Sequence, residues 1–268
     1  MGIYESEGWN LRDAAVSILQ NNLYGLDIDK RAYQLSYFAL MMKARQYNRR
    51  ILTPSNEEER VKPNVFEIKE SNNIYRDLLT GTSVNQQAKD DFTSLLNQMY
   101  DAKEYGSLLE VKPIDFDNLR LALQNQELAM FDTVIKEDII PLIDCAKLLS
   151  RQYDVVVTNP PYKFAQEFVE HAMDIVTDGH KVAMFLKLTF LESSGRKKLF
   201  RKYPPKKIWV SSSRIPCGKN GDFYDRDKDG NIKYDKNGNP KEVSSAVCYA
   251  WFIFQKGYDG PMIVDLFN

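Results

Sequence analysis

The chain has 268 residues, of which 27% are charged and 43% are hydrophobic, and its formal net charge is −1. This length suffices for one large or two small domains with a buried core, and the near-zero charge gives no bulk attraction to nucleic acid. Three scattered cysteines without a CxxC pair, with only two histidines, argue against a disulfide framework or a metal site and predict a reducing, cytoplasmic location. No apolar run approaches the roughly 20 residues of a membrane span, so we expect no membrane contact.

The first 71 residues combine periodic apolar patterns of two kinds. Helices are predicted at residues 11–20 and 30–47, and strands at residues 21–29 and 61–71. The first strand, NNLYGLDID, ends in Asp27 and Asp29, which suits a strand whose carboxyl end meets a polar ligand. Asp29 is also placed to be the N-cap of the helix that follows.

Residues 72–150 differ in composition, being helical in pattern, polar, and rich in Gln and Asn. Gly106 is predicted to follow the end of a helix as a C′ glycine, and Asp115 or Asp117 to cap the start of another. We interpret the range 72–150 as a helical insertion between two strands.

After residue 150 the alternation of strands and helices resumes. The predicted elements are a strand at 154–158, a helix at 164–176 that Gly179 ends, and strands at 181–192, 206–212 and 246–257. This order predicts an α/β fold with a right-handed, doubly wound sheet. Residues 216–243 form a turn-rich excursion before the last strand. Trp209, Trp251, Phe252 and Phe254 are predicted to be core.

The stretch YDVVVTNPPYKF, residues 153–164, ends a run of valines in two prolines. Three consecutive valines predict a strand buried on both faces of a parallel sheet, and the prolines stop it abruptly. The Asn159 amide oxygen and the Pro160 carbonyl are two acceptors that can hold an exocyclic NH₂ group and leave its nitrogen electron-rich. The Tyr162 ring offers a stacking face to a planar base that has left the duplex. The alternative is a rigid turn without a catalytic role.

The segment TNPPY, residues 158–162, resembles motif IV of the N6-adenine DNA methyltransferases, which use S-adenosylmethionine as methyl donor. Residues 22–44 resemble the second-strand region of the large adenine methyltransferases of type IIG restriction-modification and BREX phage-defence systems. Residues 186–200, SRIPCGKNGDF and SAVCYAWFIFQKG resemble phage-type enzymes of the same class. The resemblance covers most of the chain and is weakest in the 72–150 insertion. It implies that residues 1–268 form a methyltransferase catalytic domain with a Rossmann-like class I S-adenosylmethionine-dependent fold and a mostly parallel, twisted sheet.

The resemblance also implies roles for the residues of the turn. Asn159 and Pro160 would bind the N6 amino group of a flipped adenine in double-stranded DNA, within a motif that includes Pro161. Tyr162 would stack on that base. The same motif serves methyltransferases of RNA or of a protein amide nitrogen, so these substrates stay open.

Two acids are expected to contact S-adenosyl-L-methionine. Asp27, at the end of the second strand of the family, would accept both hydroxyls of the cofactor ribose. Glu70, predicted to end the third strand, would contact the cofactor adenine. Asp27 has the alternative of a solvated turn residue.

The chain departs from the family pattern at its N-terminal end. The glycine-rich FxGxG cofactor loop is expected before Leu11, where no such pattern occurs, so the chain resembles a catalytic domain that is short at this end. The central first strand of the fold would then be absent. A second polypeptide could supply the loop or the target recognition, or the chain could be a remnant that does not bind cofactor. Residues 261–268, PMIVDLFN, weakly resemble the entry to such a strand in a permuted order.

Other patterns allow a functional and a structural reading. Asp225, Asp227, Asp229 and Gly230 match the first half of a calcium loop, but Asx turns explain the same residues. The basic run 195–207 is either a solvated face or a patch for DNA phosphates. Of the histidines, His171 is expected on a helix surface and His180 in a turn.

Overall fold

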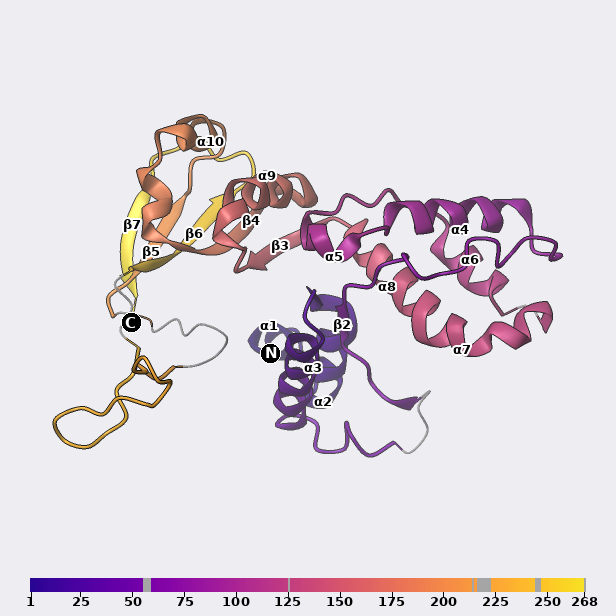
Figure 1. Ribbon diagram of the computed structural model, residues 1–268, viewed down its shortest axis with the longest axis horizontal. Helices are drawn as coiled ribbons and strands as arrows, with labels where there is room; N and C mark the ends of the chain where they lie inside the picture. The colour runs from indigo at the N-terminus through magenta and orange to yellow at the C-terminus, as the bar shows by residue number, and fades with distance from the viewer. Residues whose placement is uncertain (55–58, 125, 214, 216–222, 244–246, 268) are drawn as a thin grey trace. The chain divides into compact units, whose positions relative to one another are not determined.

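The computed structural model describes residues 1–54, 59–124, 126–213, 215, 223–243 and 247–267 (Figure 1). It forms two compact units, unit 1 (Met1–Arg151) and unit 2 (Gln152–Asn268). Within the described ranges, no helix is both long and apolar enough to cross a membrane.

Unit 1 is mainly helical and holds one small sheet. Its α-helices are α1 (Gly2–Ser6), α2 (Leu11–Ser17), α3 (Lys30–Arg45), α4 (Gln86–Gln98), α5 (Ala102–Tyr105), α6 (Phe116–Ala122), α7 (Asp132–Val134) and α8 (Ile140–Leu149). The π-helical segments are η1 (Ile18–Asn22) and η5 (Ile135–Ile139), and the 3₁₀ segments are η3 (Gly106–Leu108) and η4 (Gln126–Phe131). Strands β1 (Tyr24–Asp27) and β2 (Asn64–Glu67) pair in parallel, with Asp27 opposite Glu67.

Side-chain caps fix where the unit 1 helices begin. The Asp29 carboxylate accepts hydrogen bonds from the backbone N–H groups of Arg31 and Ala32, so the predicted cap of α3 is confirmed. Asp115, rather than Asp117, caps α6. Gly106 follows α5 with a φ of 58°, as predicted for a glycine that ends a helix.

The range 72–150 builds one continuous core together with the small sheet. Side chains of α4, α6 and α8, including Phe92, Leu119 and Leu142, are buried in a cluster that also contains Ile68, just after β2, and contacts Leu26 of β1. The carboxyl end of the two-stranded sheet is therefore held in place by these helices.

Unit 2 is a five-stranded mixed sheet with helices. Its elements are β3 (Tyr153–Thr158), η6 (Tyr162–Phe164), α9 (Ala165–Ile175), β4 (Val176–Lys187), η7 (Leu188–Glu192), η8 (Ser194–Arg196), α10 (Lys197–Lys202), β5 (Lys207–Ser211), β6 (Tyr249–Gln255) and β7 (Ile263–Phe267). The strand order is β3-β4-β6-β5-β7. The β3–β4 and β5–β7 pairs are parallel, whereas β6 runs antiparallel to both of its neighbours, which the sequence did not indicate.

Three predictions about unit 2 are wrong. The valines of β3 are not buried on both faces: Val155 is 57% and Val157 63% exposed, because β3 is an edge strand of the described sheet. The strand expected over 181–192 ends at Lys187, and the residues after it turn into a 3₁₀ helix. Trp209 is 40% exposed, while Phe252 and Phe254 are core as predicted.

The position of the C-terminal strand tests the hypothesis that residues 261–268 form the first strand of the fold in a permuted order. β7 pairs with β5, with Ile208 opposite Val264, and so lies at the sheet edge opposite β3. It therefore does not take the place beside β3 that a permuted first strand would fill.

Candidate active site

The NPPY turn leaves β3 at its carboxyl end. Thr158, the last residue of β3, is paired with Met184 of β4, and Asn159 is exposed while Pro160 is buried. The Pro161 carbonyl accepts a hydrogen bond from the N–H of Phe164 at 2.9 Å, which closes the short helix η6 that leads into α9. The buried proline and this closed turn hold Asn159 at the surface in a fixed place.

The two predicted acceptors at this turn make no hydrogen bond within the described protein. Among the described residues, neither the Asn159 side chain nor the Pro160 carbonyl oxygen has a hydrogen-bond partner within the protein. These are the two groups that the sequence chemistry requires for an exocyclic amine. Asn159 is exposed, whereas Pro160 is buried, so of the two predicted acceptor residues only Asn159 lies openly at the surface.

Tyr162 is half-buried and lines a cavity of about 70 Å³. Lys187, the last residue of β4, places its Nζ 4.7 Å from the centre of the Tyr162 ring. The ring of Tyr249 lies 6.1 Å away at an angle of 41°. A base that stacks on Tyr162 therefore meets a ring that already has a cation over it.

Two cations near Tyr162 were not among the predicted catalytic or cofactor-binding residues. Besides Lys187, the cavity is lined by Arg196, whose guanidinium lies 4.5 Å from the ring centre of Phe190 and donates to the Phe190 carbonyl oxygen at 3.0 Å. Arg196 lies in the basic run 195–207, for which a patch for DNA phosphates is one of the two interpretations of the sequence. Lys187 lies in the middle of the strand predicted at 181–192, so no local pattern indicated it.

Asp27 ends β1 and is half-buried. Its Oδ1 accepts a hydrogen bond from the N–H of Asp29 at 2.8 Å, and its backbone carbonyl accepts one from Ile68. Its other carboxylate oxygen has no partner among the described residues. The geometry fits a carboxylate that is held by one oxygen and presents the other to a hydroxyl ligand.

Glu70 is not at the end of a strand, because β2 ends three residues earlier at Glu67. Glu67 forms ion pairs with Lys103 at 2.9 Å and with Lys69 at 3.5 Å. Burial opposes ionisation of Glu67 most strongly, but the hydrogen bond from Lys103 and the charge of Lys69 outweigh it and lower its pKa. Thus Glu67, not Glu70, lies opposite Asp27 across the strand pair. Asp27 and Glu70 belong to unit 1 and the NPPY turn to unit 2.

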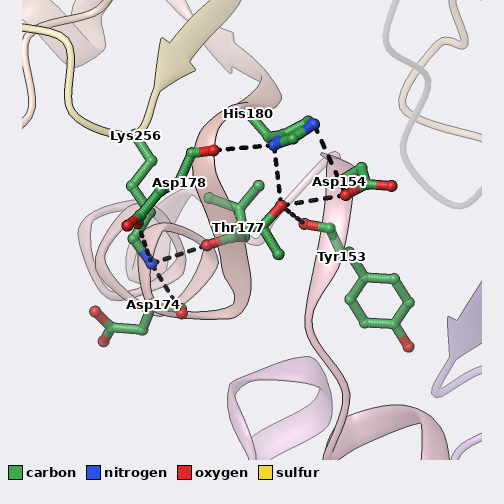
Figure 2. Close-up of polar contacts among 8 residues, drawn as sticks. Tyr153, Asp154, Asp174, Thr177, Asp178, His180 and Lys256 are labelled. Carbon is green, nitrogen blue, oxygen red and sulfur yellow. Dashed lines mark hydrogen bonds and ion pairs between the residues drawn. The ribbon is translucent and has the colours of Figure 1, made fainter.

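His180 lies at the other end of the unit 2 sheet. Figure 2 shows its Nδ1 beside the Thr177 hydroxyl and the Asp178 carbonyl, both at 3.0 Å, with Asp154 nearby. The next residue of β4, Lys181, pairs with Val155 near the start of β3. His180 thus lies within β4, near the start of the β3–β4 pair, and the prediction that it is a turn residue is wrong.

The acidic excursion does not build a calcium site among the described residues. The Asp227 carboxylate accepts hydrogen bonds from the N–H groups of Asp229 and Asn231, as Asx turns do. Lys233 and Lys241 pair with Asp225. No described group of His, Cys, Asp and Glu side chains could hold a metal ion. Positions 216–222 of the excursion lie outside the described residues.

Comparison with known families decides what kind of chain carries this turn. The model for the Eco57I restriction-modification methylase matches residues 21–175, more than half of the chain, which includes Asp27 and the NPPY turn. The chain belongs to the Eco57I restriction-modification methylase family. Membership of this family confirms the sequence resemblance, and the α/β architecture observed here agrees with it.

Curated relatives match over a similar region. The chain is 36% identical over 168 residues to "Adenine-specific methyltransferase PglX" of Lacticaseibacillus casei (strain Zhang), a match covering 60% of this chain and 14% of that protein. It is 34% identical over 187 residues to "Adenine-specific methyltransferase BrxX" of Escherichia coli O9:H4 (strain HS), covering 60% and 15%. The chain thus spans about a seventh of the length of these relatives.

A solved structure, "ATP-dependent Type ISP restriction-modification enzyme LlaBIII bound to DNA", aligns with 99% of this chain and 16% of its own, at 10% identity and a TM-score of 0.36.

Proposed function

We propose that the chain is the catalytic part of an S-adenosylmethionine-dependent N6-adenine DNA methyltransferase of the restriction-modification or phage-defence type. The observation that carries the proposal is the turn after β3 in a chain of the Eco57I methylase family, where Asn159 is exposed and neither its side chain nor the Pro160 carbonyl has a hydrogen-bond partner among the described residues.

In the proposed reaction, S-adenosylmethionine supplies a methyl group on a sulfonium. The flipped adenine would donate two hydrogen bonds from its N6 amino group, one to the Asn159 amide oxygen and one to the Pro160 carbonyl oxygen. These two hydrogen bonds would leave the nitrogen lone pair free to accept the methyl group that S-adenosylmethionine would supply as its sulfonium becomes a thioether, and one N6 proton would then pass to water. No covalent intermediate with the protein is formed.

The other site residues have supporting roles in this proposal. Pro161 keeps the turn rigid, and Tyr162 contacts the extruded base. Asp27 holds the cofactor ribose with its free carboxylate oxygen, while Glu70 is kept only as a secondary contact to the cofactor adenine. Residues 72–150 form an insertion within a catalytic domain that spans residues 1–268.

The test of the mechanism is Asn159→Ala. The substitution removes the amide acceptor from an exposed side chain, so we expect methylation of duplex DNA to fall to background while the unfolding midpoint is unchanged. Methyl transfer is measured with labelled cofactor, and Lys163→Ala, an exposed neighbour in η6, is the matched control. Retained methylation by Asn159→Ala would remove the mechanism.

A second candidate is a subunit that needs another polypeptide. β3 pairs with β4 alone in the described part of the chain, where no strand lies against its other edge, and Val155 and Val157 are exposed. A strand carrying the glycine-rich loop could pair there, either from a longer chain or from a partner.

Calorimetric titration with S-adenosylmethionine separates the two candidates. Heat of binding to this chain that is lost in Asp27→Asn favours the self-sufficient enzyme. No binding by the chain, restored when a polypeptide with the glycine-rich loop is added, favours the subunit. Parallel assays with DNA, RNA and protein acceptors distinguish the substrate class.

A further inference from the structure

We propose that Lys187 and Arg196 form a binding site for a backbone phosphate of the DNA strand that carries the extruded adenine. The inference rests on the proposed function for the identity of the strand, and it assigns a role to a cavity beside the NPPY turn. The cavity lies within unit 2 and is lined by Tyr162, Ala165, Leu186, Lys187, Thr189, Phe190 and Arg196.

The position of the cavity follows from strand register. Thr158, which ends β3, is opposite Met184, and β4 continues three residues further to Lys187. Lys187 therefore reaches beyond the end of β3, to the level of the NPPY turn. The carboxyl ends of neighbouring parallel strands are where α/β sheets bind their ligands.

The positive charges of Lys187 and Arg196 favour an anion as the ligand of this cavity. Lys187 and Arg196 are half-buried, and neither has an ion-pair partner among the residues that the structure describes. The Arg196 Nη1 is occupied by the Phe190 carbonyl, which fixes the guanidinium and leaves its other N–H groups to donate. The exposed Thr189 hydroxyl adds one donor that needs no charge.

Size favours a phosphate over a larger group. The cavity holds about 70 Å³, several times the roughly 10–15 Å³ that one water molecule requires. A group with the volume of a phosphate fits there, while the base itself lies outside, at the exposed Asn159. Because one sugar joins a base to its phosphates, a base seated at Asn159 and Tyr162 brings a phosphate close to this cavity.

The proposal is tested by the salt dependence of DNA binding. The probe is a fluorescent duplex with one unpaired adenine, which costs less to extrude than a paired base. Dissociation constants are measured by anisotropy over a series of salt concentrations, without methyl donor. Each phosphate contact contributes about 0.9 to the slope of log K against log salt, so Lys187→Gln and Arg196→Gln should each lower its magnitude by about one.

Lys181→Gln is the matched control. Lys181 is exposed on the same strand and, six residues from Lys187, on the same face but near the opposite end of the sheet. The Lys181→Gln substitution removes the same charge as Lys187→Gln and should leave the slope of log K against log salt unchanged. Lys187→Arg keeps the charge and should restore the slope, and unchanged unfolding midpoints exclude misfolding as the cause.

Several results would overturn the phosphate site. One is an unchanged slope of log K against log salt in both Lys187→Gln and Arg196→Gln, and another is an equal decrease of the slope in Lys181→Gln. The others are no binding of the probe by the wild-type chain, and a decrease of the slope with an RNA probe of the same sequence but not with the DNA probe. The proposed function fails by a different result, methylation retained by Asn159→Ala. An Asn159→Ala protein with the wild-type slope would support the phosphate site independently of the chemistry.

Discussion

At the scale of single residues, two aspartates only two positions apart have separate surroundings. Asp29 uses its carboxylate for the first N–H groups of α3, and Asp27 uses one oxygen for the N–H of Asp29. Because the cap satisfies backbone N–H groups of α3 that would otherwise lack a partner, Asp29 contributes to the stability of the fold. The second carboxylate oxygen of Asp27 has no hydrogen-bond partner among the described residues, and we assign Asp27 to the proposed cofactor site.

We expect Asp29→Ala to lower the free energy of unfolding of unit 1 by about 1 kcal/mol, the usual cost of losing an N-cap side chain. Urea unfolding followed by circular dichroism measures the change. Asp27→Asn is the companion variant: it keeps an oxygen for the Asp29 N–H and should change stability by less than about 0.5 kcal/mol. A larger loss from Asp27→Asn than from Asp29→Ala would contradict this division of roles.

At the scale of elements, the strand ends decide which side chains are available to a ligand. β3 ends at Thr158 because two prolines cannot continue a ladder, and this could be predicted from the sequence. The end of β2 at Glu67 could not, because residues 61–71 alternate past that point and β2 ends where its partner β1 ends, with Glu67 opposite Asp27. The same holds for β4, whose continuation LTFLE is apolar enough for a strand but turns so that Phe190 enters the unit 2 core.

At the scale of the whole molecule, the described residues form separate cores in the two units. Phe92 lies in the unit 1 core with the helices of the range 72–150. Phe252 lies in the unit 2 core with β4 and α9. Units with their own cores can unfold in separate transitions, for which a single melting temperature is not defined.

We therefore expect two transitions in thermal unfolding, each sensitive to its own core. Phe92→Ala and Phe252→Ala each remove a fully buried ring, which costs about 3–5 kcal/mol. Phe92→Ala should lower one midpoint and Phe252→Ala the other, as measured by calorimetry. If either variant lowers both midpoints equally, the units are one cooperative structure.

The sequence by itself determined the local features whose physics is local. The NPPY turn, the Asp29 cap, the Gly106 helix end and the apolar periods of α3 and α9 follow from backbone restrictions and from side chains a few residues apart. Only the tertiary structure decided which strand lies at an edge, that β6 is antiparallel, and that Lys187 and Arg196 meet at Tyr162. Those outcomes depend on contacts between segments far apart in the chain, which no local pattern records.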